Sequence, residues 1–174
     1  MKSARSSSRA TSAPIPSDIG LYCHDVDADT GKGTCTPLCT GSLVAPTCDA
    51  GLTCFDVLAI PLCVAECDPL LLGCPAGQAC NYRTYAFGCW PIMDEPKQEL
   101  EVCEDLNQCE PGSMCLGSEY AAACDPSEIG CCAAYCDLDD PGVCPSVGEI
   151  CRPFFLPGDA PPEYQDVGVC ALPE

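Results

Sequence analysis

The chain has few of the residues from which a globular core is normally built. Leucine, isoleucine, valine and phenylalanine together make up just under a fifth of its 174 residues, and its formal net charge is −19. Such a composition is typical of a disordered chain, because apolar burial cannot offset the conformational entropy lost on folding. A large hydrophobic core is therefore excluded, and folding needs another source of stability.

Basic residues are scarce as well, and they are unevenly placed. The chain has 7 lysines and arginines against 26 aspartates and glutamates, and Lys2, Arg5 and Arg9 all precede Asp18. The rest of the chain is strongly negative and repels nucleic-acid phosphates and anionic lipid headgroups. This excludes nucleic acid as a partner and leaves cations, proteins or polysaccharides at the cell surface.

Histidine is almost absent. His24 is the only one, so any Ser/His/Asp or Cys/His arrangement would have to use it, and we expect an ordinary surface residue there. Carboxylates are numerous, but in a chain this acidic a pair of them is not a specific sign of glycosidase chemistry. No glycine-rich phosphate loop is present. We therefore assign no catalytic residue and predict that the chain is not an enzyme.

Long apolar runs are also missing. No segment approaches the roughly 18 apolar residues of a transmembrane helix. Residues 1–20 are rich in serine, alanine and proline and lack the run of about 7–15 apolar residues that a secretory signal needs. We expect a disordered tail at 1–20, and no export signal is visible in this chain.

Cysteine, in contrast, is abundant. There are 20, more than a tenth of all residues, which predicts a disulfide scaffold in which cross-links replace a large core. Such bridges persist only in an oxidising compartment, so we expect an extracellular or cell-surface protein, with the periplasm as an alternative. Either an export signal is missing upstream of Met1, which we favour, or the protein leaves the cell by another route.

The cysteines are spaced as a repeat. In two consecutive units, five residues separate the second cysteine from the third and eight separate the third from the fourth. We identify four units and, before them, a half unit with Cys23 and Cys35. The units contain Cys39, Cys48, Cys54 and Cys63; Cys67, Cys74, Cys80 and Cys89; Cys103, Cys109, Cys115 and Cys124 with the doublet Cys131 and Cys132; and Cys136, Cys144, Cys151 and Cys170.

These units predict a small disulfide-rich fold of tandem short β-hairpins with little regular secondary structure. The segment 91–102 has two prolines, several acids and no cysteine, so we place a linker there. It separates an N-terminal cysteine-rich lobe at 21–90, which holds the half unit and two units, from a C-terminal lobe at 103–174, which holds two units.

Connectivity does not follow from sequence alone. Our hypothesis joins the first cysteine to the third and the second to the fourth within each unit, because interlaced bridges would pin a hairpin against the preceding turn. The half unit then pairs Cys23 with Cys35. The third unit, with six cysteines, stays open, although adjacent Cys131 and Cys132 are expected to have different partners.

Local structure is expected to be sparse. A glycine three residues before a cysteine suggests a turn that leads into a short strand, and the eight-residue intervals 55–62 and 81–88 suit hairpins. Helix is limited to single turns, for which 118–124 and 131–136 are the candidates.

Metal binding has two candidate forms. Structural zinc sites usually combine closely spaced cysteines with histidine, whereas this chain has no Cys-x-x-Cys and one histidine, so we do not predict zinc. Alternating Asp25, Asp27 and Asp29 offer oxygen ligands for calcium, but the glycine and the final acid of an EF-hand are misplaced or absent. The alternative is a polar hairpin turn. Calcium is the only cofactor for which the sequence offers a candidate.

Aromatic residues gather in two places. One expected hairpin contains Tyr82, Tyr85, Phe87 and Trp90, and the long final interval between cysteines contains Phe154 and Phe155. Exposed aromatics are typical of interfaces and sugar-binding platforms, but these side chains could equally form the core of a chain so poor in aliphatic residues. Both interpretations remain open.

The segments TGKGTC-TPLCTGS, CDPLLLGCPAGQAC, CCAAYCDL and APPEYQDVGVCALPE resemble a family of uncharacterised cysteine-rich secreted proteins from myxobacteria and related bacteria. The resemblance covers about residues 20–174 and implies an exported precursor with further cysteines upstream. Members are sometimes labelled ribulose-phosphate epimerase, but a (β/α)₈ barrel needs about 250 residues of alternating strand and helix. The third unit is similar in style to dickkopf- or colipase-like modules.

Together these features predict an extracellular, non-catalytic structural or interaction module of the cell surface or matrix. Two alternatives belong to other classes: a small secreted enzyme or enzyme inhibitor, and a calcium-dependent adhesive module.

Overall fold

The computed structural model describes residues 20–24, 26–42, 44–57, 60–83, 86–93, 95–140, 142 and 144–173. The expected tail up to residue 19, the calcium candidate Asp25 and the aromatic Tyr85 therefore lie outside the described residues.

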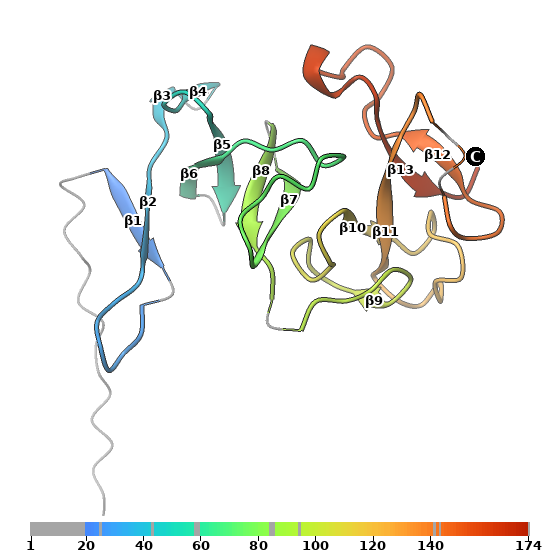
Figure 1. Cartoon of the computed structure of the whole chain (residues 1–174), viewed down its shortest axis with the longest axis horizontal. Helices are drawn as coiled ribbons and strands as arrows, with labels where there is room; N and C mark the ends of the chain where they lie inside the picture. The colour runs from blue at the N-terminus through green and yellow to red at the C-terminus, as the bar shows by residue number, and fades with distance from the viewer. Residues whose placement is uncertain are drawn as a thin grey trace, which may run out of the picture.

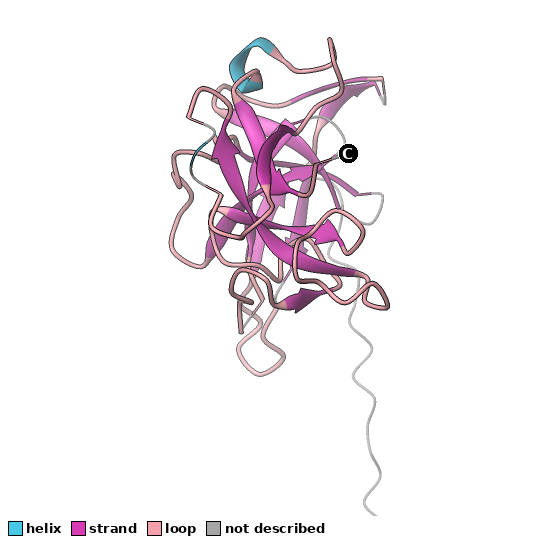
Figure 2. Ribbon diagram, turned by 90° about the vertical axis from the view of Figure 1, so that its right-hand side faces the viewer, coloured by secondary structure: helices cyan, strands magenta, loops and turns pink. Residues whose placement is uncertain are grey.

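Short antiparallel strands dominate the described residues, as Figure 2 shows, and the predicted fold class is confirmed. The strands are β1 (Leu21–His24), β2 (Thr34–Pro37), β3 (Thr40–Ser42), β4 (Ala45–Thr47), β5 (Leu52–Val57), β6 (Ile60–Ala65), β7 (Gln78–Arg83), β8 (Ala86–Pro91), β9 (Val102–Cys103), β10 (Ser113–Gly117), β11 (Gly130–Asp137), β12 (Ile150–Pro153) and β13 (Val167–Ala171). A 3₁₀ helix, η2, spans Pro162–Tyr164.

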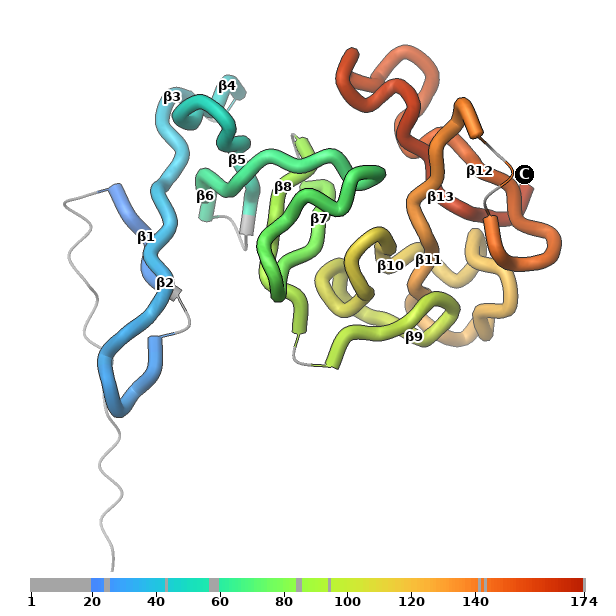
Figure 3. The backbone as a smooth tube through the Cα atoms, viewed as in Figure 1, coloured from blue at the N-terminus to red at the C-terminus, as the bar shows by residue number. Residues whose placement is uncertain are grey.

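The units follow one another along the long axis of the molecule. In Figure 1 the hairpins β1–β2, β5–β6 and β7–β8 succeed each other from the N-terminal side, and the strands from β9 to β13 occupy the other end. The tube in Figure 3 shows the same order, with the colour passing from blue at the N-terminal side to red at the other end. The first four hairpins are separate two-stranded sheets, and the last five strands form one sheet in the order β10-β11-β13-β12, with β9 beside β11.

All four complete units share one plan. An entry segment ends at the first cysteine, and a later hairpin carries the third and fourth cysteines on facing positions. The residue before the first cysteine pairs with the residue before the fourth in every unit, as Leu38–Leu62, Glu66–Gly88, Val102–Cys131 and Tyr135–Val169. In each unit the entry segment therefore lies beside the returning hairpin strand, through a strand in the last two units and through a single bridge in the first two.

A glycine turn starts each hairpin, as the sequence predicts. In the first unit the Leu52 amide donates to the Asp49 carbonyl at 3.0 Å, and Gly51 has a φ of 80°. A turn of this kind needs positive φ at its third position, which glycine adopts without strain. The glycines of the other hairpins also have positive φ: Gly20, Gly77, Gly112 and Gly148.

The half unit is the hairpin part of the same plan. Cys23 faces Cys35 across β1 and β2, in the positions that third and fourth cysteines occupy elsewhere. The Leu38 amide donates to the Gly20 carbonyl at 2.7 Å, matching the bond from Glu66 to Gly51 in the first complete unit. This repetition of hydrogen bonds supports the assignment of β1–β2 as a hairpin without its own entry segment.

The third unit differs from the expectation in two ways. Its fourth cysteine is Cys132, not Cys124, because Cys132 is the residue that faces Cys115 across β10 and β11. The prediction of a helical turn at 131–136 is wrong, because this segment lies within β11 and pairs with three other strands. The other candidate, 118–124, has a hydrogen bond from the Ala121 amide to the Gly117 carbonyl. The segment consists of turns and contains no helix.

Two apolar clusters complete the interior. One is centred on Phe55, Leu62 and Val64 between the first two complete units. The larger joins the second unit to the C-terminal end through Phe87 and Tyr164, which come from opposite sides of the predicted 91–102 linker. The two-lobe boundary itself stays a prediction, but residues on both sides of it share one core.

Candidate functional site

Disulfides are the most abundant side-chain feature of the molecule. All twenty cysteines are paired, and the first-to-third and second-to-fourth scheme is confirmed wherever it was proposed. The bridges are Cys23–Cys35, Cys39–Cys54, Cys48–Cys63, Cys67–Cys80, Cys74–Cys89, Cys103–Cys115, Cys109–Cys132, Cys124–Cys131, Cys136–Cys151 and Cys144–Cys170. The third unit obeys the same scheme once Cys132 is counted fourth, and Cys124–Cys131 is an additional bridge inside its hairpin.

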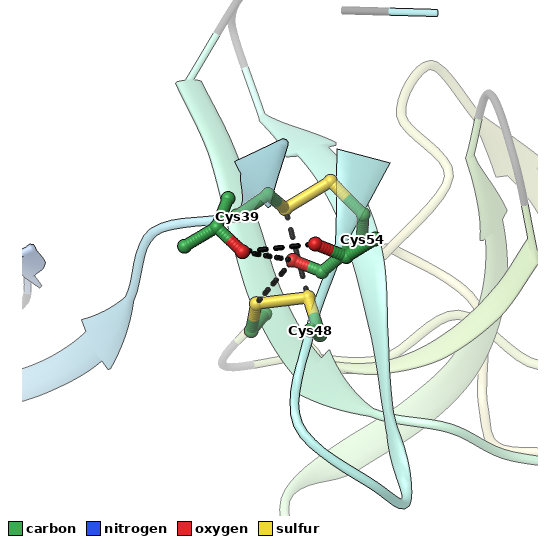
Figure 4. Close-up of a disulfide and its surroundings, with 6 residues drawn as sticks. Cys39, Cys48 and Cys54 are labelled. Carbon is green, nitrogen blue, oxygen red and sulfur yellow. Dashed lines mark hydrogen bonds between the residues drawn. A yellow bond between two sulfur atoms is a disulfide. The ribbon is translucent and has the colours of Figure 1, made fainter. Parts of the chain in front are cut away.

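The two bridges of a unit lie against each other. Figure 4 shows this in the first complete unit, where Sγ of Cys48 lies 3.8 Å from Sγ of Cys39. The loop between these cysteines is closed by a 2.9 Å hydrogen bond between the hydroxyls of Thr40 and Thr47. In the third unit the buried cluster consists of cysteines alone, Cys103, Cys109 and Cys132, so sulfur replaces an aliphatic core there.

Three cysteine sulfurs crowd within 4.8 Å of one another in each complete unit. Such groups could suggest metal centres, but metal binding by cysteine requires the thiolate form. Every one of these sulfurs is already in a disulfide. Their closeness follows from the interlaced bridges and gives no support to a zinc site.

The calcium candidate is a self-contained turn where it is described. Oδ1 of Asp27 accepts hydrogen bonds from the Thr30 amide at 2.6 Å, the Thr30 hydroxyl at 2.7 Å and the Asp29 amide at 3.1 Å. The bonds from Thr30, its hydroxyl first, hold the pKa of Asp27 below the ordinary value. These contacts fit the polar-turn alternative, because Oδ1 already has three donors. Calcium binding by Asp25, Asp27 and Asp29 stays a prediction.

Four of the candidate aromatic side chains, Tyr82, Trp90, Phe154 and Phe155, pack against the apolar clusters. Tyr82 packs edge-on against Phe154 and Phe155 with ring centroids 5.2 and 5.3 Å apart, and Trp90 stacks on Phe55 at 5.6 Å. All four candidates are half-buried. The structure therefore favours the second interpretation, in which these side chains form part of the core. Ligand binding by them stays a prediction.

Phe87, an aromatic residue of the same hairpin, is the centre of the larger cluster. Its side chain is fully buried, and its ring contacts five other rings: Tyr82, Tyr135, Phe154, Phe155 and Tyr164. Tyr164 also donates a hydrogen bond of 3.3 Å to Glu66 and one to the Cys67 carbonyl. Burial raises the pKa of Tyr135 and of Tyr164, for which the nearby Glu66 carboxylate adds to the effect.

Exposed leucines form a surface feature that sequence reasoning missed. Leu71 and Leu72, at the tip of the loop between Cys67 and Cys74, are 75% and 59% exposed. The loop borders an open groove whose other wall includes Tyr135 and Asp137 of β11, together with Asp166. The three consecutive leucines at 70–72 were the available signal, but their exposure depends on packing that no sequence pattern specifies.

Two buried carboxylates also come from segments far apart in the chain. Oε1 of Glu149 accepts a 3.1 Å hydrogen bond from the Ala122 amide. Its other oxygen and Oε1 of Glu99 are buried and find no hydrogen-bond partner among the described residues. Burial, and then the charge of Glu149, raise the pKa of Glu99. The fold therefore favours the protonated form of Glu99.

Among the described residues, no helix has the length and apolar character needed to cross a membrane. No protein-family model, curated protein or solved structure matches this chain.

Proposed function

We propose that this chain is an extracellular, disulfide-stapled interaction module of the cell surface or matrix, without catalytic activity. One observation carries the proposal: every cysteine is in a disulfide bridge, and each complete unit is held by two interlaced bridges. A fold stabilised in this way depends on an oxidising environment. The units then act as a rigid support for the loops that project from them.

The non-catalytic part of the proposal rests on where the strongly shifted titratable groups of the described residues lie. Catalytic sites combine a concave pocket with titratable groups in named roles. The strongly shifted groups here are Tyr135 and Tyr164, both of which belong to the aromatic cluster.

We assign the interaction to the groove beside Leu71 and Leu72. Exposed leucines supply apolar contact area, and Asp68, Asp137 and Asp166 surround the groove with negative charge. Complementary charge at the rim of an apolar surface favours a partner that carries both lysine or arginine and apolar side chains. The occupant that fits is a basic, apolar segment of another protein.

Peptide binding tests the groove. A labelled peptide of alternating lysine and leucine should bind the chain in a fluorescence-anisotropy titration, and L71S/L72S should weaken that binding about tenfold or more, because it removes a central apolar contact. V147S is the matched control, since Val147 is also exposed but does not line the groove. Equal loss in both variants, or stronger binding to dextran than to the peptide, would exclude the groove.

Cellular location is tested separately. In cells that produce the protein from its own gene, it should be found in the medium or be accessible to protease on intact cells. Alkylation of the unreduced protein should label none of the 20 cysteines, and alkylation after reduction and denaturation should label all of them. An intracellular protein with alkylatable thiols would refute both the location and the bridged fold.

A further inference from the structure

One disulfide differs from the other nine in its accessibility. Cys35 is the only exposed cysteine among the twenty, all of which are described, and Cys23 is half-buried. Each of the other nine bridges has at least one buried cysteine. The access of an attacking thiol is one of the factors that set the rate of thiol–disulfide exchange. The first hairpin therefore carries the bridge that an external molecule can reach.

The same bridge has a connectivity that the fold uses nowhere else. In the four complete units the third and fourth cysteines also face each other across a hairpin, yet each is bonded to an earlier cysteine of its unit. Only Cys23 and Cys35 are bonded directly to their facing neighbour, with Cα atoms 3.9 Å apart against 5.4–5.9 Å in the other bridges. No second bridge interlaces with this one, so its opening leaves the disulfides of the four complete units intact.

We propose that Cys23–Cys35 is a site of thiol–disulfide exchange at which the chain becomes covalently attached to an external thiol. The thiolate of the incoming molecule attacks Sγ of Cys35, because that sulfur belongs to the exposed partner. The bond between Cys35 and Cys23 breaks, a mixed disulfide forms on Cys35, and Cys23 leaves as a thiolate that takes up a proton from water. No external oxidant or reductant is consumed.

Charge around the hairpin determines which thiols react fastest. Its loop exposes Asp27 and Asp29 against a single lysine, Lys32, and the whole chain has a formal charge of −19. Like charges slow the approach of an anionic reactant, and salt screens this effect. The site favours a cationic thiol over an anionic one.

Limited exchange on the full chain tests the proposal. The protein is treated with cysteamine under native conditions, remaining thiols are blocked with N-ethylmaleimide, and the modified peptides are identified by mass spectrometry. We expect cysteamine on Cys35 and N-ethylmaleimide on Cys23, about tenfold or more ahead of any other pair. Modification that begins at another bridge, at all bridges together, or only in denaturant would overturn the proposal.

Two comparisons sharpen the result. C23S/C35S should remove the early adduct while its other cysteines stay protected; an unchanged adduct yield would contradict the assignment. Mercaptoethanesulfonate should react more slowly than cysteamine with the native protein, and added salt should reduce the difference. Neither comparison involves the groove beside Leu71 and Leu72. The test of the exchange site is therefore independent of the test of the proposed binding function.

Discussion

At the scale of single residues, Phe87 illustrates how the molecule uses its few large side chains. The chain has 4 phenylalanines, and this one contacts five aromatic rings while being completely buried. Aromatic pairs stabilise beyond the area that they bury. One ring at the centre therefore organises side chains from the second and fourth units.

Phe87→Ala should be strongly destabilising. Removal of a buried phenylalanine costs about 3–5 kcal/mol, because apolar burial is lost and a cavity remains. Denaturant unfolding with the disulfides intact measures this change. Leu156→Ala is the control, since Leu156 is 73% exposed in the same final loop as Phe154 and Phe155 and should change stability little. Similar effects of the two substitutions would contradict the central position of Phe87.

Glu99→Gln should make the protein more stable at neutral pH. The pKa of Glu99 is raised in the folded state, by burial first and then by Glu149, so the fold favours its protonated form. The stabilisation from that proton is present below the unfolded-state pKa of about 4.5 and is lost as pH rises through the folded pKa. Glutamine never carries the charge, so the gain in stability of Glu99→Gln over the unmodified protein is largest at pH values above the folded-state pKa of Glu99.

Unfolding midpoints at about pH 7 and about pH 3.5 test this prediction, since the gain should shrink once the wild-type carboxyl is protonated. Glu95→Gln removes an exposed charge from the same segment and controls for net charge alone. A loss of stability in Glu99→Gln at neutral pH would show that the carboxylate has a favourable partner.

At the scale of structural elements, close packing between hairpins depends on a glycine in β8. A β-carbon on Gly88 would lie 2.5 Å from Cγ2 of Val64 and 2.9 Å from Cδ2 of Phe55. Both side chains belong to the cluster of the first complete unit. Gly88 thus permits β8 to approach the preceding hairpin.

Gly88→Ala should cost about 1–3 kcal/mol, because Val64 and Phe55 have to move in a packed interior. Thermal unfolding measures the loss, and near-ultraviolet circular dichroism should report the changed surroundings of Trp90, which stacks on Phe55. Gly73→Ala is the matched control: a β-carbon there meets no atom within 4 Å. Equal stability of both variants would contradict the close approach.

The additional bridge of the third unit can be removed without disturbing the repeat. Cys124–Cys131 closes a short loop with a sequence separation of 7, which corresponds to about 2–3 kcal/mol in the chain-entropy model. C124S/C131S should therefore fold with every remaining cysteine protected from alkylation. C115S, in contrast, should expose the thiol of Cys103, its partner. If Cys109 became open to alkylation in C124S/C131S, Cys124 rather than Cys132 would be its disulfide partner.

At the scale of the whole molecule, the units are joined by shared clusters as well as by the chain. Tyr164, in η2, bonds to Glu66 and to the Cys67 carbonyl, residues nearly a hundred positions earlier. The second unit should therefore open together with the C-terminal end, whereas β1–β2 lies outside the aromatic cluster.

Hydrogen exchange with Phe87→Ala tests this coupling. The amides of β7 and β8 and those of β12 and β13 should lose protection together, because cooperative units share their opening free energy. Protection in β1 and β2 should stay as in the unmodified protein. Loss confined to β7 and β8 would show that the predicted 91–102 linker separates two independently stable lobes.

Much of this architecture was predictable from the number of residues between successive cysteines and from the glycines that precede them. The number of residues between cysteines limits which sulfurs can meet, and the glycine three residues before the third cysteine marks a turn that requires positive φ. The third unit shows where this reasoning fails. Cys124 follows Cys115 at the same eight-residue interval as the fourth cysteines of the first two units, yet the hairpin continues to Cys132.

The sequence by itself therefore determined the disulfide class and the repeat, because these depend on composition and on residues that are close in the chain. It suggested the pairing as a hypothesis, which the structure confirmed. Tertiary structure alone decided that the aromatics meet as a core and that Leu71 and Leu72 project beside acidic side chains. It also decided that Cys35 is exposed. These outcomes depend on contacts between distant segments, which local spacing and composition do not specify.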